Sequence, residues 1–246
     1  MTKGKAATAR AVALAGSSGS GKTSLMEAML FAAGARGRQG RVESGDTHGD
    51  ASPEARERGF STELNLARFD YLGDRYTLLD LPGSIEFAAE GLHVLPAVDV
   101  AVVVVEPDLA KLASAQPVLK TLDAQGVPHM IFVNKIDHAS VRARDMLAAL
   151  QEVSPRPLVM RQIPIWEGEH VEGFIDLALE RAYVYREGEA SRRVDIPSEL
   201  ADREADARFQ MLERLADFDD DLMETLLEEA EPERSAVFDD LSRELA

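Results

Sequence analysis

The segment from Gly16 to Thr23 constrains the fold of this chain more than any other feature. It reads Gly-Ser-Ser-Gly-Ser-Gly-Lys-Thr and fits the pattern G-x-x-x-x-G-K-S/T. Glycines at these positions let backbone amides converge on a phosphate group, and the start of the following helix adds its positive dipole end. The pattern therefore requires a strand before Gly16 and a helix after it. The apolar run 11–15 and the helical pattern over 22–33 meet both requirements.

The alternative for this segment is a flexible turn of glycine and serine. Its place between a predicted strand and a predicted helix favours phosphate binding instead. We expect Lys22 to bridge the β- and γ-phosphates of a nucleotide, and the Thr23 hydroxyl to ligate Mg²⁺. The residues predicted to surround the phosphates are Gly16, Ser17, Gly19, Ser20, Gly21, Lys22, Thr23 and Ser24.

The second motif, Asp80-Leu81-Pro82-Gly83, stands at the end of an alternating segment. In enzymes with a phosphate loop, an acidic residue at the end of a neighbouring strand holds Mg²⁺, commonly through water. We therefore expect Asp80 at the metal and the Gly83 amide at the γ-phosphate. By itself, the D-x-x-G pattern is explained about as well by an ordinary turn.

The third motif, Asn134-Lys135-Ile136-Asp137, follows the apolar segment 127–133. The Asp137 carboxylate can accept both the N1–H and the exocyclic amine of guanine, a pair that adenine does not offer. We expect Asn134 to tie the base to the phosphate loop and the Lys135 stem to lie over the ring; the alternative for Asp137 is a helix N-cap. All three motifs follow strands, and ligands of open α/β sheets bind at that edge. The sequence therefore predicts binding of GTP or GDP with Mg²⁺.

Strand-like and helical segments alternate up to about residue 154 and predict a doubly wound α/β sheet. The expected hairpin is 62–71 and 75–81, the expected strands are 98–105 and 127–133, and the expected helices are 109–124 and 141–153. Residues 34–60 show no period and are typical of a long functional or mobile loop. We expect its carboxylates Glu43, Asp46 and Asp50 to be solvated.

The pattern changes after residue 154, where the sequence Ser-Pro-Arg-Pro intervenes. Segments 158–165 and 174–185 are strand-like, and a long acidic amphipathic helix is expected over 197–229, followed by a short last helix. We therefore predict two domains, a nucleotide-binding core over 1–154 and a small α+β domain over 155–246.

The composition excludes several classes of function. With 27 basic and 44 acidic residues the net charge is −17, which disfavours broad nucleic-acid binding, since phosphate contacts need Lys and Arg. From Ser198 to the end there are 17 acidic and 5 basic side chains. Without cysteine no disulfide or thiolate metal site is possible, and the cytoplasm is the expected compartment. The most apolar stretch, 98–105, is far shorter than the roughly 20 residues of a membrane span, so no membrane partner is expected.

On these motifs the chain resembles translational GTPases, most closely elongation factor G, over nearly its whole length. Glu57-Arg58-Gly59-Phe60-Ser61 resembles their switch segment, usually Glu-Arg-Gly-Ile-Thr, which implies that Ser61 is a further Mg²⁺ ligand. Residues 163–165, 173–177 and the acidic helix 215–231 resemble the subdomain inserted into that factor's G domain. The resemblance implies a P-loop NTPase G domain with this insert, and the ribosome as partner. It also implies that the acidic helix faces the basic domain of the ribosomal stalk protein; the alternative is a solvated helix face.

The departures from the family pattern bear on hydrolysis. Ser17 and Gly19 stand where the family carries His and Asp, and Ser84 replaces the histidine that orients the attacking water. The resemblance thus implies a GTPase that is weak in isolation, with Lys22 and Ser84 at the catalytic positions. One alternative is a regulatory paralogue that binds GTP without efficient hydrolysis. Another is an adenine-nucleotide kinase or ATPase that shares only the phosphate loop. The family's final Ser-Ala guanine motif has no convincing counterpart, so we expect the chain to be a fragment.

Overall fold

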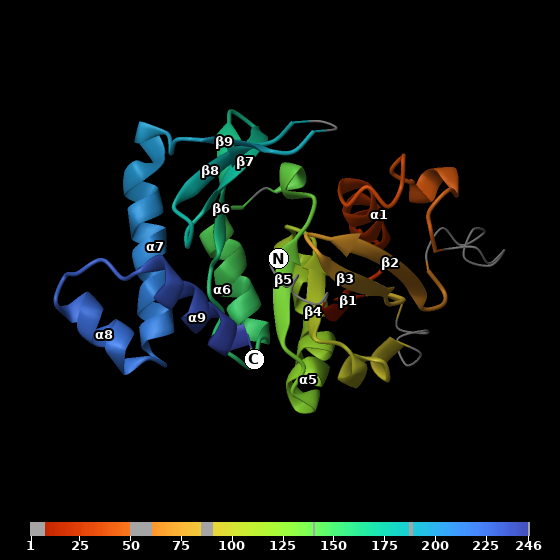
Figure 1. Cartoon of the computed structure of the whole chain (residues 1–246), viewed down its shortest axis with the longest axis horizontal. Coiled ribbons are helices and arrows are strands. Elements are labelled where there is room, and N and C mark those ends of the chain that lie inside the picture. Colours follow the sequence, from red (N-terminus) through yellow and green to blue (C-terminus); the bar gives the residue numbers. More distant parts are fainter. Residues whose placement is uncertain (1–7, 50–60, 85–90, 140, 187–188, 246) are drawn as a thin grey trace, which may run out of the picture. The chain divides into compact units, whose positions relative to one another are not determined.

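The computed structural model describes residues 8–49, 61–84, 91–139, 141–186 and 189–245. The chain divides into two compact units, Met1–Lys135 and Ile136–Ala246 (Figure 1). The helix that follows residue 142 groups with the second unit. The predicted boundary after residue 154 concerns the start of an inserted subdomain, and it stays a prediction.

A five-stranded sheet forms the centre of the first unit. Its strands stand in the order β2-β3-β1-β4-β5; β2 and β3 pair antiparallel, and the other neighbours pair parallel. This topology confirms the predicted α/β fold with a mostly parallel sheet. The strands are β1 Ala9–Ala15, β2 Asn65–Tyr71, β3 Asp74–Asp80, β4 Val100–Val105 and β5 His129–Val133.

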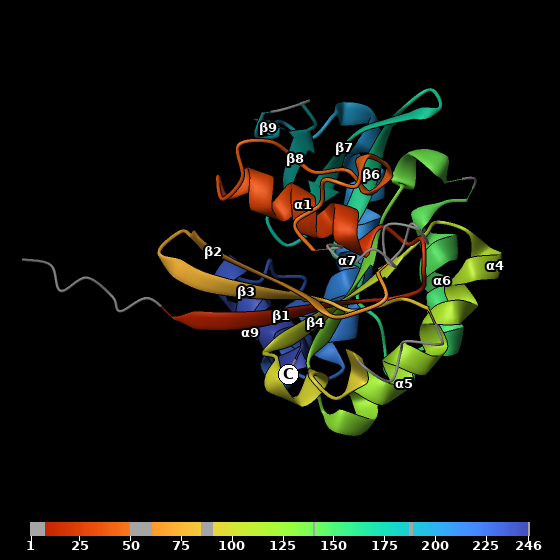
Figure 2. The same cartoon turned by 90° about the vertical axis from the view of Figure 1, so that its right-hand side faces the viewer.

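The middle strands are buried because their residues are apolar on both faces. Ala13, Leu14, Val103 and Val104 are completely shielded from solvent. Figure 2 shows α1 on one face of the sheet and α5 on the opposite face. The helical segments of this unit are α1 Lys22–Ala32, η1 Val42–Ser44, η2 Leu95–Ala97, α4 Leu109–Leu112, η3 Ala113–Ala115 and α5 Gln116–Gln125.

Two predictions for this unit are wrong in detail. The helix predicted over 109–124 is divided into α4, η3 and α5, and Pro117 stands in the first turn of α5, where its missing N–H loses no helical bond. The strand predicted over 127–133 begins at His129 and is only half buried, with Met130 and Phe132 exposed. In the part of the chain that the structure describes, no strand pairs with the second edge of β5, so β5 is an edge strand.

The second unit contains a four-stranded antiparallel sheet in the order β6-β7-β8-β9. Its core joins Ile163 and Ile175 of the strands to Leu215, Leu222 and Val237 of the helices. This arrangement confirms the predicted small α+β region. The elements are η4 Ile136–His138, α6 Ala143–Val153, β6 Gln162–Glu167, β7 His170–Asp176, β8 Arg181–Val184, β9 Arg192–Val194, η5 Ser198–Leu200, α7 Ala201–Ala216, α8 Asp220–Leu227 and α9 Arg234–Leu245.

The second unit also differs from its prediction. The long acidic helix expected over 197–229 is two main helices, because the Asp219 carboxylate accepts a hydrogen bond from the Leu222 amide at 2.9 Å and starts α8 anew. The strand expected over 174–185 is divided into β7 and β8, and Glu180 between them has a φ of 51°. None of the described helices is long and apolar enough to cross a membrane.

Candidate functional site

Two glycines fix the path of the loop between β1 and α1. Gly16 has a φ of 136°, and a Cβ there would collide with the carbonyl oxygen of Val104 on β4. Gly21, the N-cap of α1, has a φ of 93°, and a Cβ there would collide with the side-chain amide of Asn134. Side chains are strained in both conformations. The glycines of the motif are therefore required by the backbone itself.

Lys22 folds back over the same loop. Its side chain is nearly buried, and its ammonium group donates a hydrogen bond to the Ser17 carbonyl at 2.9 Å. Gly83 approaches from the end of β3, and a Cβ there would collide with the Lys22 ammonium and lie 2.7 Å from the Ser18 amide nitrogen. The glycine of D-x-x-G is therefore needed for close approach. Ser84, next in the chain, is partly exposed.

The three predicted Mg²⁺ ligands meet in one place. The Thr23 hydroxyl, at the start of α1, donates to an Asp80 carboxylate oxygen at 2.6 Å and lies 3.2 Å from the Ser61 hydroxyl. All three residues are buried, Asp80 completely. Hydroxyl and carboxylate oxygens are the hard donors that Mg²⁺ prefers, so this chemistry fits the ion. The switch residues 57–60 before Ser61 lie outside the described residues.

The third motif reaches the phosphate loop from far along the sequence. The Asn134 amide nitrogen donates to the Ser20 carbonyl at 2.9 Å, and the Lys135 ammonium donates to the Gly19 carbonyl at 2.7 Å. Lys135 has a φ of 54°, a left-handed conformation that costs on the order of 1 kcal/mol. The structure brings these two residues against the loop. Ser24, by contrast, is exposed in the first turn of α1.

Glu106 is a site residue that the sequence reasoning missed. It follows β4 directly, and one carboxylate oxygen pairs with the Lys135 ammonium while the other accepts from Lys111 at 2.5 Å. These hydrogen bonds, from Lys111 first and Lys135 second, lower the pKa of Glu106. Glu106 is therefore ionised at neutral pH and holds Lys135 in place. An acid directly after a buried strand, at the same sheet edge as the motifs, is the signal that points to it.

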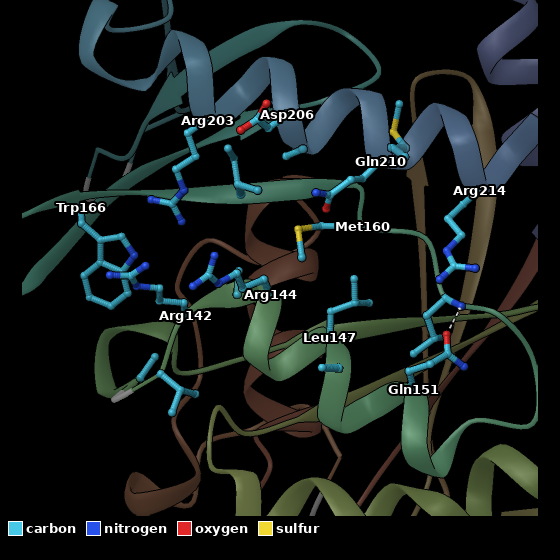
Figure 3. A pocket seen from close by; sticks show the side chains of 18 of the residues that line it. Arg142, Arg144, Leu147, Gln151, Met160, Trp166, Arg203, Asp206, Gln210 and Arg214 are labelled. Carbon is cyan, nitrogen blue, oxygen red and sulfur yellow. Dashed lines mark hydrogen bonds between the residues drawn. The ribbon is translucent and has the colours of Figure 1, made fainter. Parts of the chain in front are cut away.

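Asp137, the predicted reader of guanine, belongs to the second unit. It lies in η4, its side chain is 67% exposed, and His138 Nε2 lies 3.4 Å from one carboxylate oxygen. It also lines a cavity of about 1680 Å³. Figure 3 shows Arg203 and Gln210 of α7 on one side of this cavity and Arg144 and Leu147 of α6 on the other.

The lining of this cavity is of mixed charge. Arginines stand beside carboxylates such as Asp206 and Asp217, so its charge selects no single class of ion. Trp166 is partly buried on β6 and forms part of the wall. We assign this cavity no ligand.

Known proteins resemble the chain over most of its length. A family model described as "Elongation factor Tu GTP binding domain" matches residues 7–231. The "Elongation factor G-like protein" of Synechocystis sp. is 45% identical over 236 residues, which cover 96% of this chain and 35% of that protein. The "Elongation factor G 1" of Geobacter sulfurreducens is 30% identical over 211 residues, which cover 85% of this chain and 31% of that protein.

A solved structure agrees with the fold. A crystal structure of a protein from Thermus thermophilus matches with a TM-score of 0.87 and 33% identity, over 96% of this chain and 35% of that one. The chain thus spans about a third of the length of the relatives that it matches. Because the family model covers most of the chain and the folds agree, the chain belongs to the elongation factor Tu GTP-binding domain family and, within it, to the elongation factor G-like translational GTPases.

Proposed function

We propose that this domain binds GTP and GDP together with Mg²⁺ and is the GTPase part of a longer, ribosome-associated switch protein. One observation carries the proposal: the Thr23, Ser61 and Asp80 oxygens converge beside Lys22. In this assignment the phosphates sit on the loop amides and Lys22, while the three oxygens hold Mg²⁺ directly or through water.

The bound nucleotide would order two segments. Ser61, the proposed Mg²⁺ ligand, precedes β2, and Gly83, whose amide is expected at the γ-phosphate, follows β3. Both segments would therefore respond to the presence of the γ-phosphate. GTP with Mg²⁺ would hold these segments, and loss of the γ-phosphate would release them, as in other order–disorder switches. Asp137 would read the guanine base through its exposed carboxylate.

Calorimetric titration tests this proposal. GTP and GDP should bind in the presence of Mg²⁺, ATP should bind more weakly, and Thr23→Ala should lose most of the dependence on Mg²⁺. Ser114→Ala is the control, because Ser114 is an exposed hydroxyl on η3, outside the three motifs. A preference for ATP over GTP would refute the proposal in favour of a kinase or ATPase.

Hydrolysis depends on Ser84. Serine is shorter than the histidine that this position carries in the family, and its hydroxyl is not basic enough to orient the attacking water as that histidine does. We therefore expect slow turnover, and Ser84→His should raise the rate. Multiple-turnover assays of the full-length protein with ribosomes separate a GTPase from a hydrolysis-deficient paralogue. A rate equal to that of an ordinary translocase, with Ser84 unchanged, would refute the role given to this position.

We propose the ribosome as partner and the cytoplasm as the place of action. Relatives carry the names "Elongation factor G" and, at 28% identity, "Ribosome-releasing factor 2, mitochondrial" of Pongo abelii. The acidic region also exposes apolar side chains, with Phe218 55% and Leu227 77% accessible. An acidic surface with apolar residues suits a basic partner, and the stalk protein's basic domain is the one proposed here.

Salt dependence tests this contact. Binding of the purified stalk domain should weaken as salt rises, because exposed charges are screened. Leu227→Ser should weaken it further, whereas Tyr71→Ser, at an exposed position on β2, should not. Equal binding by the wild type and Leu227→Ser would assign α8 a purely solvated role.

A further inference from the structure

Glu27 is a buried carboxylate that no nucleotide motif includes. It lies on α1 with no exposed surface. Its oxygens accept hydrogen bonds from the Gly40 amide at 3.0 Å and the His48 amide at 2.5 Å, and one of them also pairs with the Arg36 guanidinium. A buried charge is tolerated only when it is paired and hydrogen-bonded. Here every one of these donors comes from a single loop, residues 36–48.

The same loop is closed on itself by a second carboxylate. Asp46, predicted to be solvated, accepts a hydrogen bond from the Arg41 amide at 2.7 Å and pairs with Arg38. The Arg41 amide is the main cause that lowers the pKa of Asp46, and Arg36 also donates to the Asp46 carbonyl at 3.1 Å. Residues 36–48 therefore form a compact loop, and Glu27 is its attachment to α1.

The described end of the loop lies against the start of β2. Any side chain at Gly49 would collide with the Asn65 side chain, so Gly49 packs tightly against it. Asn65 pairs in register with Asp80 across β2 and β3. Glu27 and Thr23 are four residues apart on α1, so they share one face of that helix. Glu27, which holds the loop, and the Thr23 hydroxyl, a predicted Mg²⁺ ligand, thus lie on the same face of α1.

We infer that Glu27 is a positioning residue, which holds residues 36–48 against α1 and thereby places the end of this loop beside the Thr23, Ser61 and Asp80 oxygens. The inference rests on the proposed binding of GTP with Mg²⁺. Glu27 touches neither nucleotide nor metal in this assignment. Its loss would act by loosening the loop, and the effect on binding should appear mainly when Mg²⁺ is present.

Trypsin provides a direct readout, because Arg36, Arg38 and Arg41 are cleavage sites within the loop. Glu27→Gln should raise the rate of cleavage at these sites at least about tenfold, because the charge-assisted hydrogen bonds of a buried carboxylate are lost. Glu43→Gln is the matched control: Glu43 is in the same loop, exposed, and makes no hydrogen bond or ion pair with the described residues. Cleavage at Arg75, on β3, monitors global unfolding.

Two further measurements keep the inference testable. Should Glu27→Gln fail to fold, Arg36→Gln removes the ion pair with Glu27 and the hydrogen bond to the Asp46 carbonyl but keeps the Glu27 carboxylate, and cleavage after Arg38 and Arg41 should still rise. For binding, the ratio of GTP affinity with Mg²⁺ to that in EDTA should fall in Glu27→Gln and stay unchanged in Glu43→Gln.

The outcomes separate this inference from the proposed function. If trypsin cleaves the loop of Glu27→Gln and of Arg36→Gln at the wild-type rate, Glu27 does not anchor the loop. Glu27→Gln could be cleaved faster while its ratio of GTP affinity with Mg²⁺ to that in EDTA stays unchanged. Glu27 would then anchor the loop without positioning it beside the Thr23, Ser61 and Asp80 oxygens. If the wild type binds no GTP, the proposed function fails, while the cleavage rates still decide whether Glu27 anchors the loop.

Discussion

The two ends of the candidate nucleotide site are built differently. At the phosphate end, Lys22, Thr23 and Asp80 are buried and already hydrogen-bonded to their neighbours within one unit. At the base end, Asn134 is tied to the phosphate loop, but Asp137 lies in the other unit with most of its carboxylate exposed. The side chains at the phosphate end are thus held by hydrogen bonds, whereas the Asp137 side chain at the base end is mostly exposed to solvent.

This difference predicts that the phosphate end determines affinity and the base end determines specificity. Preorganised groups lose little freedom when a ligand arrives, so most of the binding energy should come from the phosphates. A single exposed carboxylate would contribute less energy, but in the proposed assignment it is the group that distinguishes guanine from adenine. Affinity and specificity should therefore respond to different substitutions.

The largest effect is expected for Lys22→Ala. Loss of a buried ammonium that is proposed to bind the phosphates should weaken the binding of both GTP and GDP about a hundredfold, the equivalent of one strong charge-assisted contact. Titration calorimetry measures it, with Lys120→Ala on the exposed face of α5 as the control. A loss shared equally by Lys120→Ala would mean that net charge, rather than the loop, governs affinity.

A smaller and more selective effect is expected for Asp137→Ala. The preference for GTP over ATP should fall about tenfold, because two hydrogen bonds to guanine are lost while the phosphate contacts remain. Competition binding measures the ratio, and Asp145→Asn, an exposed carboxylate on α6, should leave it unchanged. An unaltered ratio in Asp137→Ala would remove the base-reading role from this residue.

Glu106→Gln tests the link between the two ends. Without its charge Lys135 is held less firmly, and GTP affinity should fall about threefold, as expected for one ion pair near the surface. The pKa of Glu106 is lowered from its ordinary value of 4.5, so its contribution to stability is present above pH 4.5 and is lost as the pH falls below that value. Thermal melts of wild type and Glu106→Gln should therefore converge in acid. Curves that stay equally far apart at all pH values would contradict this.

The sequence predicted the phosphate end better than the base end, for a physical reason. The loop and its glycines are local in sequence, so spacing alone places Gly16, Lys22 and Thr23 on one turn and one helix. Lys135 lies 29 residues after Glu106, and the Gly40 and His48 amides lie 13 and 21 residues after Glu27, so spacing alone does not pair them. The place of Glu106 directly after a buried strand is the one signal that points to it. The single helix predicted over 197–229 was wrong because aspartate is found both within acidic helices and at helix N-caps. Asp219 is the extended N-cap of α8 and accepts a hydrogen bond from the Leu222 amide.

The smallest effect on the nucleotide is expected at the opposite end of β3. Asp74 begins this strand as Asp80 ends it, and hydrogen bonds from Thr8 first, then Arg10, lower the Asp74 pKa to about 2. A carboxylate with a lowered pKa stabilises the fold above its ordinary value of 3.8, and this contribution is lost as the pH falls toward 2. Asp74→Asn should therefore lower the melting temperature at pH 7 and remove part of the acid dependence between about pH 4 and pH 2. GTP affinity should change by less than about twofold, because distant sites act independently. A larger change in affinity would mean that the two ends of this strand are coupled, and that the functional edge is less self-contained than its hydrogen bonds indicate.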